Sequence, residues 1–272
     1  MNPNLLLSIF PGIDMLGDAA EQLGFCVLRG PDVLWGGDIR KFHPPAGVFG
    51  GVFGGPPCQC FSSLRFIVQH NGHKPKFGNL IPQFRRCVME ARPQWFLMEN
   101  VRGAPIPRVP FYGSHSQLLN NRWLGESQNR LRRITFGWRG APNCICGDGP
   151  RKRGCRTVHL VLPRVAVENT LWEYAAIGGQ ARSGIGNGND RRRKGGGLRR
   201  GTSCLGLTTR SKDALVELCR KQGLPKGFDL PGMTIEAKCQ AVGNGVPMAM
   251  GRALFKAIRE LLEKGGCVDA GV

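Results

Sequence analysis

The first hundred residues alternate short apolar runs with segments of helical periodicity. Residues 5–10 form an apolar run that ends in a Pro-Gly turn, and apolar positions recur at helical spacing over 15–23. A second apolar run begins at 25–30, and a third, around 52–53, leads into a turn rich in glycine and proline. Because strands alternate with helices, the pattern predicts an α/β fold with a doubly wound, mostly parallel sheet.

The same unit recurs further along the chain. Apolar positions at helical spacing over 80–91 precede a strand at 95–98, and residues 131–136 read as another strand. A last amphipathic helix runs to residue 262, with Pro247 near its first turn, where proline is well tolerated. We expect this helix to pack on the sheet.

Residues 143–210 have a different composition. They hold 13 Lys or Arg against 4 Asp or Glu, a net charge of +9, and residues 178–201 are mostly Gly, Asn and Arg. Such a segment cannot pack a core unaided, and it predicts a small basic domain with a loop that orders on a phosphate backbone or serves only as a linker.

The overall charge narrows the class of partner. Across 272 residues, 38 Lys plus Arg stand against 19 Asp plus Glu, giving +19, which favours a nucleic acid without separating DNA from RNA. The 11 cysteines are scattered, the amino terminus lacks a secretory pattern, and no apolar run approaches about 18 residues. These features predict a cytoplasmic protein that makes no use of a membrane.

One cysteine stands where chemistry is expected. The turn Gly54-Gly55-Pro56-Pro57-Cys58-Gln59 follows an apolar strand, and ligands of open α/β sheets bind at the carboxyl edge of the strands. A cysteine there becomes a nucleophile when positive charge stabilises its thiolate, although a single loop cysteine is more often structural. The residues around Cys58 therefore have to distinguish a catalytic cysteine from a structural one.

Those neighbours carry a family resemblance. Pro57-Cys58-Gln59 resembles the signature loop of the cytosine-C5 DNA methyltransferases, and other blocks of that family follow in its usual order. They are Phe10-Pro11-Gly12, Gly37-Asp38-Ile39, Glu99-Asn100-Val101, Gln128-Asn129-Arg130-Leu131-Arg132, residues 217–225, and Gly243-Asn244-Gly245-Val246-Pro247. The resemblance implies a Rossmann-like methyltransferase domain with a small basic target-recognition domain.

The resemblance also implies catalytic roles. Cys58 would add to C6 of a flipped-out cytosine so that C5 can accept a methyl group, and Glu99 would hydrogen-bond N3. Arg132 would hold the cytosine O2, Arg130 would brace the site, and Gln128 would lie near the catalytic loop. Because Arg130 and Arg132 alternate along a strand, we expect them to share a face. Asn100 is interpreted as a brace for the loop rather than a reactant.

The implied methyl donor is S-adenosylmethionine. Its expected contacts are in the turn after the first strand, at an acidic strand end, in the cysteine turn and in the closing block: Phe10, Gly12, Asp38, Ile39, Pro57, Asn244 and Val246. The full Gly-x-Gly-x-x-Gly fingerprint is missing, which argues against a nicotinamide or flavin oxidoreductase.

The donor turn departs from the family pattern at several positions. Ser8 stands where Asp is usual, Asp14 and Met15 replace part of the glycine-rich turn, and Cys60 stands where Ser or Gly is common. For the acid that binds the donor ribose, Asp32 is the nearest candidate and Glu21 a more distant one.

These interpretations divide the chain and name its partners. We expect a catalytic and cofactor-binding domain (1–140), a target-recognition domain (141–208), a return segment with the closing helix (209–264) and a tail (265–272). The expected partners are double-stranded DNA and a restriction endonuclease, for a monomeric protein associated with the nucleoid. We expect no catalytic metal.

Three points stay open. The spacing of Cys144, Cys146, Cys155 and His159 would allow a zinc site, but it matches no common finger, and a small cluster of free cysteines is the alternative. The substrate could be RNA cytosine instead of DNA. The chain could also be a catalytically silent targeting subunit, although retention of Cys58, Glu99 and Arg132 argues against it.

Overall fold

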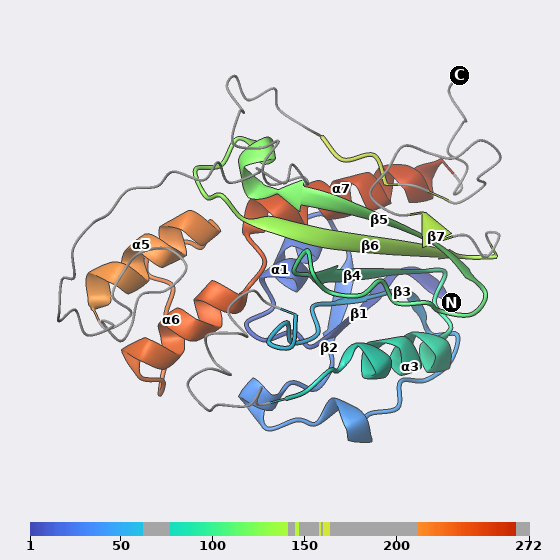
Figure 1. Cartoon of the computed structure of the whole chain (residues 1–272), viewed down its shortest axis with the longest axis horizontal. Helices are drawn as coiled ribbons and strands as arrows, with labels where there is room; N and C mark the ends of the chain where they lie inside the picture. Colours follow the sequence, from blue (N-terminus) through green and yellow to red (C-terminus); the bar gives the residue numbers. More distant parts are fainter. Residues whose placement is uncertain (62–76, 141–144, 147–157, 159, 164–210, 265–272) are drawn as a thin grey trace, which may run out of the picture.

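A computed structural model describes residues 1–61, 77–140, 145–146, 158, 160–163 and 211–264 (Figure 1). Most of the predicted recognition domain, its loop at 178–201 and the tail at 265–272 lie outside the described residues. So do three zinc candidates, Cys144, Cys155 and His159, while Cys146 is described only in its backbone. Within the described residues, no group of three or more His, Cys, Asp or Glu could hold a metal ion.

Seven strands form a single sheet in the order β2-β1-β3-β4-β6-β5-β7. β2, β1, β3 and β4 run parallel to one another. β6 is antiparallel to β4 and to β5, and β7 is parallel to β5. Their bounds are β1 (Asn2–Ile9), β2 (Cys26–Arg29), β3 (Phe49–Gly54), β4 (Trp95–Asn100), β5 (Tyr112–Asn120), β6 (Leu131–Arg139) and β7 (Ile145–Cys146).

Helices cover both faces of this sheet. α1 (Met15–Glu21) and α7 (Met248–Glu263) pack together on one face, and α3 (Ile81–Ala91) covers the other (Figure 1). Two helices, α5 (Lys212–Gln222) and α6 (Ile235–Asn244), pack on each other around a small core of their own. Short 3₁₀ turns are η1 (Val33–Trp35), η2 (Ile39–Lys41) and η3 (Asn121–Leu124).

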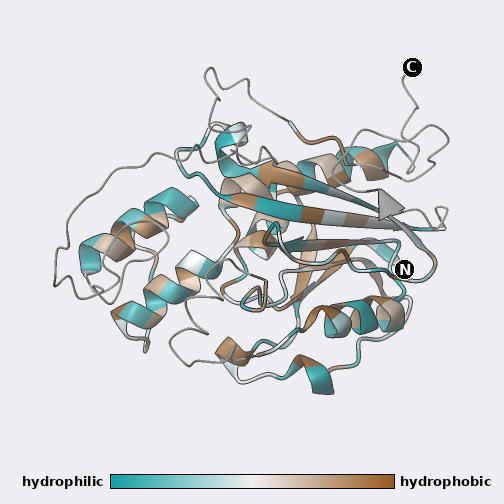
Figure 2. Cartoon of the chain, in the orientation of Figure 1, coloured by the Kyte–Doolittle hydropathy of each residue, from teal (hydrophilic) through white to brown (hydrophobic). Residues whose placement is uncertain are grey.

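The alternation of side chains along the strands explains the three layers. In β4, Trp95 and Leu97 join the core under α1 and α7, while Phe96 and Met98 join the core under α3. All six residues of β4 are buried, as expected for a strand covered on both faces. Figure 2 shows hydrophilic and hydrophobic residues together on α3 and on α7, because each of these helices buries one side only.

Local signals set the ends of several helices. Asp14, Ser211 and Thr234 accept hydrogen bonds from the first turns of α1, α5 and α6, and Gly223 ends α5 with a φ of +75°. The doubly wound, mostly parallel sheet predicted from the sequence is confirmed. Among the helices of the described residues, none is long and apolar enough to cross a membrane.

Candidate active site

The candidate site lies where the carboxyl ends of three neighbouring strands meet. β1, β3 and β4 run parallel, with Ile9 beside Gly54 and Gly54 beside Met98, so the turns that follow them converge. The chain crosses from β1 to β2 in one direction and from β3 to β4 in the other, which makes this point the topological switch of the sheet.

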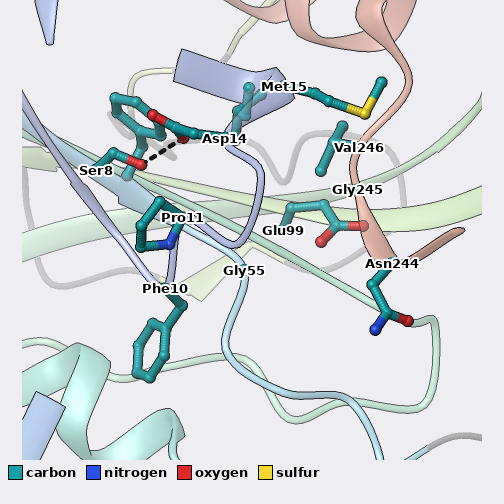
Figure 3. Close-up of a pocket in the computed structure, with 13 residues that line it drawn as sticks. Ser8, Phe10, Pro11, Asp14, Met15, Gly55, Glu99, Asn244, Gly245 and Val246 are labelled. Atoms are coloured by element: carbon teal, nitrogen blue, oxygen red, sulfur yellow. Dashed lines mark hydrogen bonds between the residues drawn. The ribbon is translucent and has the colours of Figure 1, made fainter. Parts of the chain in front are cut away.

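A pocket opens at this switch point (Figure 3). Its walls come from the end of β1 and the start of α1, from Gly54 and Gly55, from Glu99, and from the connection between α6 and α7. The empty volume, including the part that opens to solvent, is about 380 Å³. The pocket lies at the edge where open α/β sheets bind small ligands.

The cysteine turn is fixed to the end of β4. Cys58 is half-buried, and the side chain of Asn100 donates a hydrogen bond to the carbonyl of Pro56 at 2.9 Å while its Oδ1 accepts from the Val101 amide at 2.8 Å. The prediction that Asn100 braces this loop is confirmed. Gly55 allows the close approach, since a Cβ there would lie 3.0 Å from Glu99 Oε2.

A carboxylate and a guanidinium lie beside the thiol. Glu99 Oε1 is 2.9 Å from Arg132 Nε. Burial raises the pKa of the Cys58 thiol above its ordinary value, and the negative charge of Glu99 raises it further, while Arg132 and Arg130 act in the opposite direction. The structure thus brings Cys58, Glu99, Arg132 and Arg130 within electrostatic reach of one another.

The two arginines have different partners. Arg130 Nη1 donates to the Gly243 carbonyl at 2.9 Å, and Nη2 donates to Gly245 at 2.9 Å and to Asn244 at 3.4 Å. These carbonyls end α6, where the helix dipole favours a cation. Arg130 therefore holds the pocket wall, whereas Arg132 pairs with Glu99, and neither arginine lines the pocket itself.

Gln128 occupies the segment just before β6. It is buried, and its Oε1 has no hydrogen-bond partner among the described residues. A buried amide oxygen without a partner is costly, so this position is one where a bound group could supply a donor.

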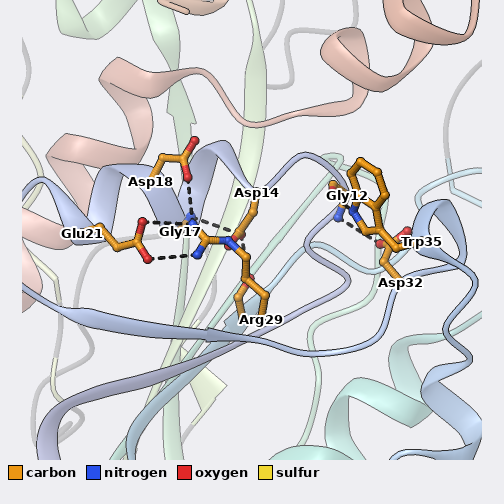
Figure 4. Close-up of polar contacts among 9 residues, drawn as sticks. Gly12, Asp14, Gly17, Asp18, Glu21, Arg29, Asp32 and Trp35 are labelled. Carbon is orange, nitrogen blue, oxygen red and sulfur yellow. Dashed lines mark hydrogen bonds and ion pairs between the residues drawn. The ribbon is translucent and has the colours of Figure 1, made fainter. Parts of the chain in front are cut away.

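The turn after β1, where the methyl donor is expected, is held by the side chains of Asp32 and Trp35. Phe10, Gly12 and Asp14 all have φ between 51° and 58°, a left-handed conformation that is strained for the two residues other than glycine. The Gly12 amide donates to Asp32 Oδ2 at 3.0 Å, and Trp35 Nε1 donates to the Gly12 carbonyl at 2.7 Å (Figure 4). No sequence motif pointed to Trp35, a residue that is 60% exposed.

The predicted donor residues divide into two groups. Phe10, Asn244 and Val246 line the pocket, and Gly12 belongs to the adjoining turn. Pro57, Asp38 and Ile39 do not line it.

One of these predictions needs correction. Asp38 does not end a strand: it caps η2 by accepting a hydrogen bond from the Arg40 amide, because a 3₁₀ turn replaces the expected strand end. Ile39 is 5% exposed and packs in the core under α3, and its contact with the adenine ring stays a prediction.

Asp32 and Glu21, the two candidates for the acid that binds the donor ribose, both make hydrogen bonds within the protein. Asp32 accepts from the Gly12 and Leu34 amides, so it sits beside the donor turn. Glu21 is bound to Arg29, its side chain is 42% exposed, and it does not line the pocket.

Sequence reasoning treated Ser8 and Asp14 only as departures from a pattern, yet both line the pocket. Ser8 Oγ donates to Asp14 Oδ1 at 2.7 Å, and the Gly17 amide donates to the same oxygen at 3.2 Å. Asp14 is 5% exposed, and burial raises its pKa to about 6, against the hydrogen bond from Ser8 and the charge of Arg29, which lower it. The one signal in the sequence was an acid within a glycine-rich turn.

Fold and site together define a class: an α/β protein that binds a small cofactor at the sheet switch point, beside a cysteine, a carboxylate and two arginines. Comparison with known proteins shows which family part of the chain is similar to. Residues 36–107, which include Cys58 and Glu99, match the family described as C-5 cytosine-specific DNA methylase.

Curated relatives agree over parts of the chain. The chain is 28% identical over 150 residues to type II methyltransferase M.NgoPII of Neisseria gonorrhoeae, covering 48% of this chain and 39% of that protein. It is 31% identical over 109 residues to M.HindV of Haemophilus influenzae, covering 36% and 33%. The chain thus spans less than half the length of these relatives.

Solved structures share the fold. An Entamoeba histolytica methyltransferase, EhMeth, superposes with a TM-score of 0.56 at 13% identity, over 96% of this chain and 99% of that one. A putative DNA modification methyltransferase from an Escherichia coli prophage gives 0.53 at 17% identity, over 95% and 99%. The predicted resemblance to the cytosine-C5 DNA methyltransferase family is confirmed, and that family uses S-adenosylmethionine.

Proposed function

We propose that this chain methylates C5 of cytosine in DNA through a covalent bond between Cys58 and C6 of the base. The observation that carries the proposal is the Cys58 turn, braced by Asn100 and set beside the Glu99–Arg132 pair at the edge of the pocket. S-adenosylmethionine would supply the methyl group when bound.

The residues support a division of labour. Because the pKa of Cys58 is raised, the resting thiol is protonated at neutral pH and must lose its proton before the thiolate adds to C6. Glu99 would hydrogen-bond N3 through a shared proton, which stabilises the negative charge that develops on the ring, and Arg132 would hold O2 once their mutual ion pair opens to admit the base. After methyl transfer, loss of the C5 proton would expel the Cys58 thiolate. Gln128 and Arg130 would support this arrangement from the segment entering β6.

The pocket fits the proposed methyl donor. Phe10, Asn244 and Val246 supply an aromatic face, a polar group and an apolar wall, and Glu99 lines the same pocket, so donor and base would meet there. Gly12 and Pro57 would shape the adjoining turns. Asp32, held against Gly12, stays the proposed contact for the donor ribose.

The proposed substrate is cytosine in duplex DNA. Duplex DNA buries C5 in the base stack, so the cytosine has to be flipped out, and residues 141–208 would hold the displaced strand through their positive charge. The curated relatives are named type II methyltransferases, which supports a restriction-modification context. We propose a partner restriction endonuclease for a monomeric, nucleoid-associated enzyme.

Labelled S-adenosylmethionine tests this function. Purified protein is incubated with mixed-sequence duplex DNA or with RNA, and 5-methylcytosine is mapped by sequencing. We expect label in DNA, no label with Cys58→Ser, and normal labelling with Cys60→Ser, a neighbouring thiol that serves as the matched control. Label in RNA alone would show that the substrate is RNA. DNA binding without label in either substrate would indicate a catalytically silent subunit.

A further inference from the structure

The pocket has an uneven distribution of charge. Two carboxylates line it, Asp14 and Glu99, and among the described residues no Lys, Arg or His does so. A methyl donor of the proposed kind carries a positive sulfonium, which becomes a neutral thioether once the methyl group has left. The donor and its product therefore differ by one positive charge in a pocket whose ionisable groups are acidic.

Asp14 is the more deeply buried of these acids. Its carboxylate is 5% exposed, and it is held by the Ser8 hydroxyl at 2.7 Å, by the Gly17 amide at 3.2 Å, and by Arg29 Nε, which is 2.9 Å from Oδ2 (Figures 3 and 4). The three contacts fix the group at the base of the pocket.

The neighbouring positions are adapted to this carboxylate. A Cβ at residue 17 would lie 2.0 Å from Asp14 Oδ2, so glycine is required there. Asp14 itself has a φ of 51°, a strained conformation for a residue other than glycine. A helix cap needs neither burial nor strain, since an exposed Asn or Ser caps as well. The cost of burying a charge points to a use for it.

We propose that Asp14 determines specificity at the donor pocket, its buried carboxylate favouring the sulfonium cation of the methyl donor over the neutral product. This inference rests on the proposed function. A carboxylate is attracted to a cation through the low dielectric of the site, and the product lacks that charge. Product would therefore leave more readily than it would from an uncharged pocket.

Binding calorimetry with S-adenosylmethionine and S-adenosylhomocysteine tests the proposal at pH 7. Asp14→Asn keeps the shape, and its amide oxygen can still accept from Ser8 and Gly17, but it loses the charge and the Oδ2 contact with Arg29. We expect the ratio of the two affinities to shift toward the product by about five- to tenfold, the size of one partly screened charge–charge interaction.

Asp18→Asn is the matched control. Asp18 binds the same Arg29, but its side chain is 44% exposed and it does not line the pocket. We expect that control to leave the ratio unchanged. An equal loss of affinity for both ligands in Asp14→Asn would overturn the proposal and leave the proposed function standing. Failure of the unaltered protein to bind either ligand would overturn the donor site, and the proposed function with it.

The unaltered protein provides a test that does not depend on the folding of a variant. Charged groups around Asp14 are Arg29 on β2, Asp18 on α1 and Glu99 across the pocket. As the pH falls from 7 to 5, Asp14 takes up a proton, and the preference for the sulfonium ligand should decline several-fold. A preference that stays constant over this range, with both ligands still bound, contradicts the role of Asp14.

Discussion

Removing the charge of Asp14 should make the stability of the protein less dependent on pH. The pKa of this group rises from 3.8 in an exposed chain to about 6 in the fold, mainly because burial penalises the charged form. The native state therefore binds a proton more tightly than the unfolded state. The stability that the group contributes is present below about pH 4 and is lost as the pH rises through about 6.

The size of this loss follows from the shift. A change of about two pKa units corresponds to about 3 kcal/mol, most of which, about 2.5 kcal/mol, develops between pH 4 and pH 8. Asn at position 14 places an amide nitrogen opposite Arg29, and this mismatch lowers stability by an amount independent of pH. The difference in pH dependence between the two proteins therefore isolates the carboxylate.

Urea unfolding at pH 4, 6 and 8 measures that difference. We expect the free energy of unfolding of the unaltered protein to fall by about 2.5 kcal/mol relative to Asp14→Asn over this range. Asp18, whose pKa burial also raises, is present in both proteins and cancels to a first approximation. Parallel curves for the two proteins would refute the reasoning, because they would mean that Asp14 titrates in the fold as it does in the unfolded chain.

Three further predictions concern the braces and the thiol. Asn100→Ala leaves the Pro56 carbonyl and the Val101 amide without their partner, so we expect a loss of about 1–3 kcal/mol in urea unfolding and a tenfold or greater fall in turnover. Asn100→Asp keeps only the acceptor, so its stability and turnover should lie between those of the unaltered protein and of Asn100→Ala. Full activity in both variants would contradict the bracing role of Asn100. Arg130→Lys loses the fork that binds the end of α6, and we expect a higher KM for S-adenosylmethionine with a smaller change in kcat, measured by initial rates. Alkylation of Cys58 by iodoacetamide, followed by mass spectrometry, should rise with pH only above the ordinary thiol range, and Arg132→Gln should slow it because a stabilising cation is lost. Faster alkylation in Arg132→Gln would contradict that electrostatic assignment.

The sheet was predictable because its signals are local and strong. Residues 95–98 form a continuous apolar run between a helix and a polar strand end, and such a run has few alternatives to a buried strand. The helix that became α7 shows an unbroken apolar face of sixteen residues' length. The strands that precede the cysteine turn and Glu99 follow from this pattern, whereas Cys58 and Glu99 themselves were singled out by the family resemblance.

Contacts between distant segments were not predictable. Gly243-Asn244-Gly245 was assigned only to the closing block of the family resemblance, and no local pattern indicated that α6 runs through Asn244. Thr234 caps the start of this helix, and the side chain of Arg130, more than a hundred residues earlier, binds its end. Asp38 was expected at a strand end, and the local 3₁₀ turn that it caps has no periodic signal. Neither feature can be deduced from spacing, since each depends on a tertiary contact or on a single hydrogen bond.

The two halves of the candidate site share one structural element, and this constrains how they can act. Arg130 and Arg132 are two residues apart at the start of β6, yet one holds the donor-pocket wall through α6 and the other holds Glu99, which itself lines the pocket. A shift of this segment would therefore move the wall of the pocket and the partner of Glu99 together. Because a carboxylate from each half lines the pocket, the charge of a bound sulfonium would act on both Asp14 and Glu99. In the proposed reaction, loss of that charge on methyl transfer would weaken both interactions at once, which favours release of the spent cofactor after the methyl group has left.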